Sequence, residues 1–228
     1  MKHPHRPHVA EVFRTLLELL VVASFVMTFV IQPIRIPSVS MQPTMRVGDF
    51  VFGNKQAFAQ EGLWSRLLPR TTIRRGDLAV FIFPPDPGKD LVKRIVGLPG
   101  DHLRLHNGHV LINGQTLPES YAFYSPAPLE PFRDDFPFLR SIDPNVDPVW
   151  WRTLRTSART GEIVVPAGQY FMLGDNRNES EDSRYWGFVS RNALLAEPAV
   201  VYLSTATEHR GSLLSRLRGL WAGFRRLR

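Results

Sequence analysis

The sequence contains no cysteine, and this absence removes several kinds of chemistry at once. Without thiols the chain forms no disulfide framework, no zinc–thiolate site and no cysteine nucleophile. It also contains no metal-binding or nucleotide-binding motif, so we expect no metal site and no cofactor. None of its seven histidines stands in a recognisable catalytic triad motif.

The central part of the chain also lacks net charge. The formal charge of +7 is concentrated at the ends, because residues 1–14 carry +2 and residues 208–228 carry +5. A neutral body between two basic ends is typical of membrane flanks and not of a DNA-binding surface. No basic patch interleaved with aromatic residues occurs in the body, so we expect no nucleic-acid partner.

Long apolar runs are also scarce, and the one clear case covers residues 15–34 with Glu18 near its beginning. Its length is about the 20 residues that a transmembrane helix requires. A cleavable signal peptide would be shorter and followed by an Ala-x-Ala-like site, which is missing here. We therefore predict a cytoplasmic tail over 1–14 and an uncleaved transmembrane helix over 15–34. The basic N-terminal flank predicts a cytoplasmic N-terminus, with the rest of the chain outside the cytoplasm.

Short apolar strands separated by turns follow the apolar run and predict an all-β domain over residues 35–207. Asn107-Gly108 and Asn113-Gly114 are dipeptides typical of tight hairpin turns. Residues 119–160 contain six prolines and show no clear period. We therefore expect residues 103–160 to form a hairpin and an irregular inserted subdomain.

Apolar residues recur at steps of three and four between positions 213 and 227, with arginines between them. This pattern predicts a basic amphipathic helix over residues 208–228. Packing on the body is one role for it, but the arginine density favours binding to anionic membrane lipids. Residues 58–70 leave a similar choice between a segment packed on the core and an apolar loop in contact with lipid.

Ser40 is a candidate nucleophile because of its surroundings. Pro37 and Pro43 restrict the backbone on either side of it, and Ser38 lies two residues before it. In an extended segment such a pair faces the same side, so both hydroxyls could enter one site. Lys93 lies in a β-branched apolar run that predicts a strand with one buried face. A lysine that points to solvent is the alternative.

Four segments, over residues 38–44, 48–49, 93–101 and 174–184, resemble in order the sequence boxes of bacterial signal peptidase I. The resemblance implies a mainly β, extracytoplasmic Ser-Lys peptidase body, with the β fold that this family shares with SOS-response repressors. It implies that Ser40 is the nucleophile and Lys93 the general base. The oxyanion would be held by the Ser40 backbone N–H and the Ser38 hydroxyl.

The resemblance also implies two supporting sets of residues. The pockets that accept small substrate residues would be lined by Ile36, Pro37, Met41 and Val92. The site would be supported from the last box by Asp175, Arg177, Ser180, Asp182 and Arg184. Within that box this sequence has Asn178-Glu179 where the family usually has Asp-Asn, so we assign no contact to either residue.

The implied function is removal of N-terminal signal peptides from exported preproteins, with cleavage after Ala-x-Ala. The partners would be preproteins and membrane lipids, and the location the bacterial cytoplasmic membrane, crossed once. Lysine acts as a base only when neutral, which requires burial to lower a pKa that is ordinarily about 10.4. The hydroxyl of Ser40 would become a nucleophile as Lys93 takes its proton.

Three other interpretations follow from the same residues. A self-cleaving repressor of the SOS type shares this chemistry, but it requires a DNA-binding region and an Ala-Gly cleavage site upstream of Ser40. A peptidase specialised for pilin or conjugation precursors is a nearer alternative. A membrane-anchored binding protein is the third, and its activity would survive replacement of Ser40 by alanine.

Overall fold

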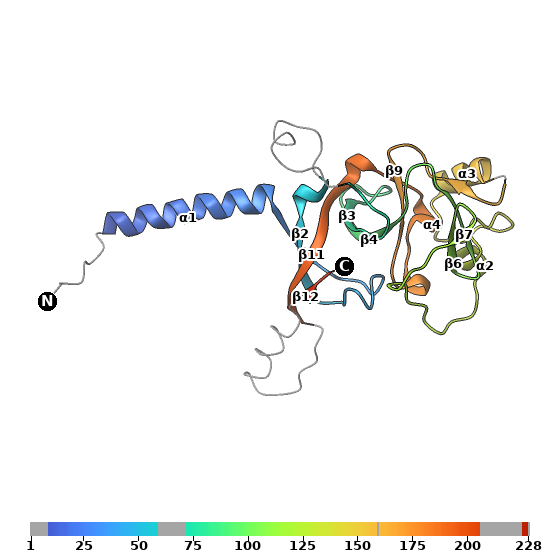
Figure 1. The fold of residues 1–228 in the computed structure, drawn as a ribbon, viewed down its shortest axis with the longest axis horizontal. Helices are drawn as coiled ribbons and strands as arrows, with labels where there is room; N and C mark the ends of the chain where they lie inside the picture. Colours follow the sequence, from blue (N-terminus) through green and yellow to red (C-terminus); the bar gives the residue numbers. More distant parts are fainter. Residues whose placement is uncertain (1–8, 59–71, 159, 206–224, 228) are drawn as a thin grey trace.

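The computed structural model describes residues 9–58, 72–158, 160–205 and 225–227. Three predicted segments lie largely outside these residues. They are the cytoplasmic tail over 1–14, the segment 58–70 and the C-terminal helix over 208–228. The described part consists of one long apolar helix joined directly to a mainly β body (Figure 1). The predicted fold class is therefore confirmed.

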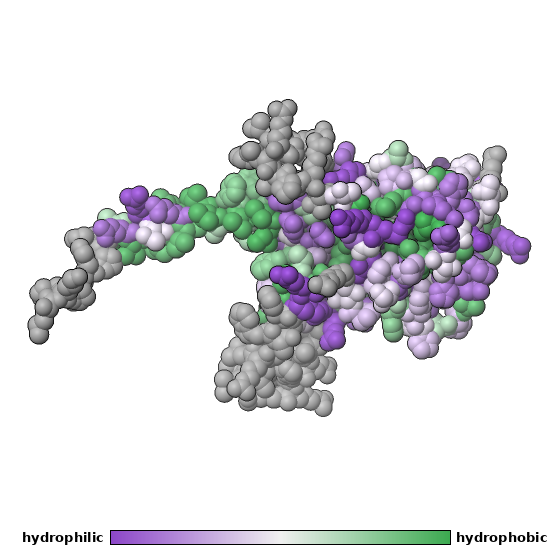
Figure 2. Space-filling view, viewed as in Figure 1, coloured by the Kyte–Doolittle hydropathy of each residue, from purple (hydrophilic) through white to green (hydrophobic). Residues whose placement is uncertain are grey.

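Helix α1, Val9–Phe29, extends from the body and has no buried residue. It is the described helix whose length and mean hydropathy of 1.9 suit a membrane span. Figure 2 shows an apolar surface along most of it, with hydrophilic residues near its beginning. The predicted boundaries 15–34 are wrong, because the helix already includes residues 9–14 and ends at Phe29. Residues 31–35 instead form an edge strand, where Pro33 is tolerated because it needs no partner for a backbone N–H.

The body binds the C-terminal end of α1 through the 3-10 helix η1, Lys55–Phe58. Lys55 Nζ donates to the carbonyl oxygen of Thr28 at 2.9 Å, and Gln56 Nε2 donates to that of Phe29 at 2.6 Å. The last carbonyls of a helix have no partner within the helix and attract cations. These contacts therefore hold the helix end against the body, and no linker separates α1 from the first strand.

The larger sheet has eight strands in the order β1-β2-β11-β3-β4-β9-β10, with β12 also paired to β11. All of its strand pairs are antiparallel. The bounds are β1 Ile31–Arg35, β2 Asp49–Asn54, β3 Leu78–Ile82, β4 Asp90–Gly97, β9 Gln169–Leu173, β10 Val189–Ser190, β11 Leu194–Ser204 and β12 Arg225–Arg226. Strand β11 has eleven residues and shifts in register, which allows it to pair with β2, β3 and β12.

The smaller sheet has four strands in the order β7-β6-β5-β8. Its bounds are β5 His102–His106, β6 His109–Ile112, β7 Gln115–Thr116 and β8 Ile163–Val164. Asn107 and Gly108 have φ angles of 50° and 79°, and Asn113 and Gly114 have 52° and 79°. Two consecutive residues with positive φ are the requirement of the type I′ hairpin turn. The hairpins predicted from these dipeptides are therefore confirmed.

The region 119–160 is less irregular than predicted, because it contains helices α2, Pro131–Asp134, and α3, Pro148–Ser157. Asp147 caps α3 by accepting hydrogen bonds from the backbone N–H groups of Val149 and Trp150. Pro148 at the first helical position also favours this start. Trp150 and Leu154, four residues apart, form the buried face of the helix. In Figure 1 this region and the smaller sheet lie at the end of the body opposite α1.

The core has two parts. The larger cluster joins the two sheets and α3 around residues such as Phe171 and Leu103. The smaller cluster lies beneath the segment that connects β1 to β2, and we call it the nucleophile-side cluster. Its members are Ile36, Met41, Met45, Val51, Leu78 and Val201, with Ile34, Val92 and Leu227 packed against it.

The predicted C-terminal helix over 208–228 is wrong at its end. Arg225 and Arg226 form strand β12, which pairs with Val201 and Val200 of β11. The apolar and basic residues at these positions recur with the helical period. The edge of β11, however, presents backbone N–H and C=O groups that need hydrogen-bond partners, and a strand satisfies them where a helix would not. The chain therefore ends its described part against the larger sheet.

Candidate active site

Ser38 and Ser40 lie just after β1, where the chain bends and turns. The premise of an extended segment was therefore wrong, yet the two hydroxyls are adjacent, with 3.2 Å between their Oγ atoms. Ser40 is only 7% exposed, whereas Ser38 is exposed. The turn thus brings one buried and one accessible hydroxyl together.

The backbone around Ser40 is held by the loop that follows β9. The backbone N–H of Asn176 donates to the Ser40 carbonyl oxygen at 3.0 Å, and its side-chain amide donates to that of Val39 at 3.3 Å. Gly174 approaches so closely that an added Cβ would lie 2.5 Å from the Ser40 oxygen and collide with Ser180. Only glycine fits at this contact.

Lys93 lies on β4, between strands β3 and β9, and is 4% exposed. Its ammonium nitrogen donates to Ser180 Oγ at 2.9 Å. Burial away from water is the main cause that lowers the pKa of Lys93 from 10.5 to about 8. The charge of Asp182 opposes this shift and that of Arg184 reinforces it. The alternative of a solvent-facing lysine is therefore wrong.

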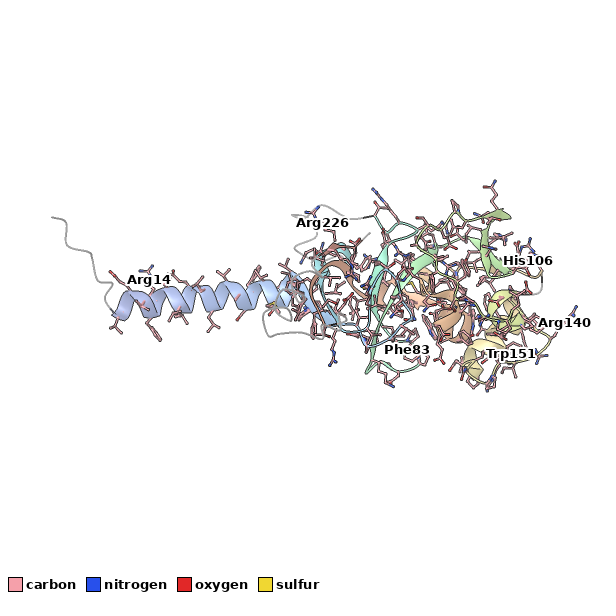
Figure 3. The ribbon with its side chains drawn as sticks, turned by 90° about the horizontal axis from the view of Figure 1, so that it is seen from below. Arg14, Phe83, His106, Arg140, Trp151 and Arg226 are labelled. Carbon is pink, nitrogen blue, oxygen red and sulfur yellow. The ribbon has the colours of Figure 1, made fainter. Side chains whose placement is uncertain are left out.

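A cleft of about 760 Å³ brings the sequence-predicted residues together. The predicted nucleophile Ser40, the predicted base Lys93 and the predicted oxyanion residue Ser38 all line it. So does Ser180, one of the predicted supporting residues. The four predicted pocket residues also line it, namely Ile36, Pro37, Met41 and Val92. The cleft includes β1 and reaches Phe83, a half-buried residue that Figure 3 labels. Asn178 and Glu179, where the sequence departs from the usual box, contribute to its wall.

Asp175 lies behind the cleft and connects its two sides. Arg94, next to Lys93 on β4, binds the Asp175 carboxylate through two hydrogen bonds of 2.8 and 2.6 Å. Thr44, on the Ser40 side, donates its hydroxyl to the same carboxylate at 2.6 Å. The guanidinium of Arg94 also lies 4.0 Å from the ring centroid of Tyr121. Sequence reasoning missed Arg94 and Thr44, although both lie within the quoted boxes.

Asp182 and Arg184 form a second buried pair behind the cleft. Arg184 Nε donates to Asp182 at 2.8 Å, and the Gly174 N–H donates to the same carboxylate at 3.1 Å. Burial opposes ionisation of Asp182, but Arg184 and Lys93 together hold its pKa below the ordinary value. Arg184 also donates to the Arg177 carbonyl oxygen at 2.9 Å. The pair thus ties the strand end at Gly174 to the loop that follows.

Arg177 connects this loop to the inserted region, a contact that sequence reasoning missed. Its guanidinium makes a bidentate, buried ion pair with Glu119. Phe123 of the inserted region forms a parallel β-bridge with Asn176. Its carbonyl oxygen accepts from the Arg177 N–H at 2.9 Å, and its N–H donates to the Asp175 carbonyl oxygen at 2.7 Å. No local sequence signal pairs residues so far apart. Part of the insert therefore supports the loop that holds Ser40.

The arrangement suits acid–base chemistry at a hydroxyl and offers no metal site in the part of the chain that the structure describes. No group of three histidine, aspartate or glutamate side chains there is placed to hold a metal ion. The charged groups behind the cleft are instead arranged as arginine–carboxylate pairs. The same cleft is lined by the adjacent hydroxyls of Ser38 and Ser40 and by the buried amine of Lys93.

Comparisons with known proteins show which family this chain resembles. A family model described as signal peptidase, peptidase S26, matches residues 9–203. A signal peptidase I of Pseudomonas fluorescens is 34% identical, over 79% of this chain and 64% of that protein. A probable signal peptidase I-2 of Synechocystis sp. is 33% identical, over 83% of this chain and 71% of that protein.

A solved structure of a signal peptidase I from Enterococcus faecalis V583 is 30% identical, with a TM-score of 0.40. The match covers 56% of this chain and 97% of that one. The chain spans just under two thirds of the length of the Pseudomonas relatives that it matches.

Replacing Lys93 by methionine should change how stability depends on pH. The folded pKa of about 8 lies below the unfolded value of 10.5, so the unfolded chain binds more protons between these values. The free energy of unfolding of the wild type, relative to Lys93→Met, should therefore rise by roughly 2 kcal/mol between about pH 7 and pH 9.5. Denaturant titrations of the full chain in detergent, followed by tryptophan fluorescence, measure this difference.

Lys89→Met is the matched control, because Lys89 is exposed and its pKa is raised above 10.5 by its hydrogen bond to Asp86. The difference in free energy of unfolding between wild type and Lys89→Met should stay constant over the same pH range. An equally flat difference for Lys93→Met would show that Lys93 is not buried as an amine of lowered pKa.

Proposed function

This chain belongs to the signal peptidase family, peptidase S26, and on that premise we propose that it removes N-terminal signal peptides from exported preproteins. It acts as a serine endopeptidase that cuts after small residues in an Ala-x-Ala pattern. The observation that supports this most strongly is that Ser40 and a buried Lys93 of lowered pKa line one cleft. A binding protein has no need for this costly pairing of a serine with a desolvated amine.

In the first half of the reaction, neutral Lys93 takes the proton of the Ser40 hydroxyl as Oγ attacks the carbonyl carbon of the second alanine. The tetrahedral intermediate collapses, the C–N bond breaks, and Lys93 gives the proton to the leaving amine of the mature protein. The signal peptide is then an ester on Ser40.

In the second half, water attacks the ester carbonyl and Lys93 takes a proton from it. When the ester bond breaks, that proton passes to Ser40 Oγ, so the enzyme ends as it began. The signal peptide leaves as a carboxylic acid, which loses its remaining proton to water and becomes a carboxylate. Ser180 orients the Lys93 nitrogen through its hydrogen bond of 2.9 Å. With a pKa of about 8, a useful fraction of Lys93 is neutral near neutral pH.

The oxyanion of each tetrahedral intermediate is held by the Ser40 N–H and the Ser38 hydroxyl. The support for this role is that Ser38 Oγ lies 3.2 Å from Ser40 Oγ, so it is near the attacking atom. Pockets lined by Ile36, Met41 and Val92 accept the two small residues before the cut. These side chains leave room for a methyl group and exclude larger ones, which accounts for alanine at both positions.

The helix α1 serves as a single membrane anchor, with the N-terminus in the cytoplasm and the body on the outer face of the bacterial cytoplasmic membrane. The basic flank of residues 1–14 supports this orientation. The cleft begins on β1, which follows α1 directly. Eleven residues from Phe29 to Ser40 span at most about 40 Å, so the site lies close to the lipid surface. A precursor can therefore be cut while its signal peptide stays in the bilayer.

Ser40→Ala and Lys93→Ala should each lower the cleavage rate by at least about 10³-fold, because each removes one half of the proton-transfer pair. The assay is cleavage of a purified preprotein with an Ala-x-Ala site by the full chain in detergent, read by mass spectrometry of the product. Ser157→Ala, on the exposed face of α3, is the matched control and should cut at the wild-type rate. Retention of most activity by Lys93→Ala would show that the assigned base is wrong.

Gly174→Ala should lower kcat by about 10²-fold, because the new methyl group pushes Ser40 and Ser180 out of position. Gly88→Ala places a methyl group in an exposed turn, where the nearest atom is 3.3 Å away, and is the control. The same cleavage assay, run over a range of substrate concentrations, separates kcat from KM. Wild-type kcat in Gly174→Ala would contradict the tight contact between this loop and the serine.

A further inference from the structure

The C-terminal strand β12 lies against the part of the body that carries the serine. It pairs with β11, and the Leu227 N–H donates to the Ala199 carbonyl oxygen at 2.9 Å. Leu227 also packs against the nucleophile-side cluster. In Figure 3, Arg226 lies at the end of the body from which α1 leaves. The chain thus returns, after about 180 residues, to the segment that contains Ser40.

Arg225 binds two acceptors on that segment. Its Nη2 atom lies 2.6 Å from Asp49 Oδ2 and 3.2 Å from the carbonyl oxygen of Thr44. Asp49 is fully buried, and its other partners are the Ser204 hydroxyl and the Arg46 N–H. Within the described residues Arg225 is therefore the cation that neutralises this buried carboxylate.

Asp49 and Thr44 belong to a loop that is closed on itself. The Ile36 N–H donates to the Asp49 carbonyl oxygen, and the Gly48 N–H donates to that of Ile36, each at 2.9 Å. Ser38 and Ser40 lie within the loop that these two bonds close. We call residues 36–49 the serine loop. A contact that holds its second half also limits the movement of its first half.

The same contact reaches the lysine side of the cleft. Thr44 offers its carbonyl oxygen to Arg225 and donates its hydroxyl to Asp175. Asp175 binds Arg94, the neighbour of Lys93 on β4. The C-terminal strand is thus connected through Thr44 and Asp175 to both sides of the site.

We propose that Arg225 is a positioning residue that holds the serine loop in its reactive geometry, with β12 as the element that places it. This inference rests on the proposed function for its kinetic consequence. Arg225 touches neither the cleft nor the dyad among the contacts of the described residues. Its effect is therefore on the position of the serine loop, which carries Ser40.

The test compares Arg225→Met with wild type in the full chain, held in detergent micelles and supplied with a preprotein that carries an Ala-x-Ala site. Arg225→Met should lower kcat by about 10–10²-fold, because small misplacement of a reacting group is costly. Arg225→Lys restores the cation beside Asp49 and should recover most of the lost kcat. Arg226→Met, whose side chain is exposed on the same strand, is the matched control and should match wild type.

A second variant pair guards against simple loss of folding. Asp49→Asn removes the charge that Arg225 neutralises. Adding Arg225→Met to this variant should therefore lower kcat by less than about threefold further. Melting temperatures of all variants are measured, and the assays are run well below them. A strand that only stabilises the fold predicts lower melting temperatures with unchanged kcat, and that result overturns the proposal.

Hydrogen exchange of peptides from the serine loop gives a readout that needs no cleavage. Arg225→Met should speed exchange in residues 36–49 and leave β4 unchanged. Unchanged exchange in the serine loop overturns the proposal whatever the kinetics show. If wild type cuts none of several Ala-x-Ala precursors, the proposed function fails. Exchange then decides the inference alone, with faster exchange supporting it.

Discussion

The desolvation of one amine is the constraint on which the rest of this structure depends. Lys93 is buried on an interior strand, and its pKa is lowered from 10.5 to about 8. Keeping such an amine protonated inside the protein costs about 3 kcal/mol, which the surrounding fold must supply. Strands β3 and β9 on either side of β4, and Ser180 at the tip of the lysine, form this environment. A surface lysine beside the same serine would remain charged and inert as a base.

The buried ion pairs explain how a loop can be rigid enough for this site. Arg94–Asp175, Arg177–Glu119 and Arg184–Asp182 are all buried and surround the segment after β9. Buried pairs are weak evidence for stability, because desolvation offsets much of their attraction. Their effect here is to fix the conformation of the loop. Another loop conformation would break a pair and leave an unpaired charge buried, which is unfavourable. That loop in turn holds Ser40 through Asn176 and leaves space only for glycine at position 174.

Local patterns predicted the parts of the fold that local physics determines. The Asn-Gly turns and the strand of Lys93 follow from φ preferences and apolar runs, and the structure has both. The end of α1 was misplaced because the apolar residues after Phe29 suit either a helix or an edge strand, and pairing with β2 decides between them. Helix α3 was missed among prolines, although Asp147-Pro148 is a readable start signal.

The long-range contacts had no such signal. The pairs Arg177–Glu119 and Arg225–Asp49 join residues 58 and 176 positions apart, and only the folded sheet brings them together. The boxes located Ser38, Ser40 and Lys93, and the structure places all of them on one cleft. Their catalytic roles remain predictions, as do those of the pocket and support residues.

The most direct test of the account is the pKa of Lys93 itself. The sequence has only four lysines, at positions 2, 55, 89 and 93, so ¹³C-labelled lysine gives few NMR signals. Comparison with Lys93→Met assigns the signal of interest in the full chain in detergent. We expect this signal to titrate with a midpoint of about 8, as burial of the amine requires. A midpoint near the ordinary value of about 10.4 would contradict the claim that the fold prepares Lys93 as a neutral base.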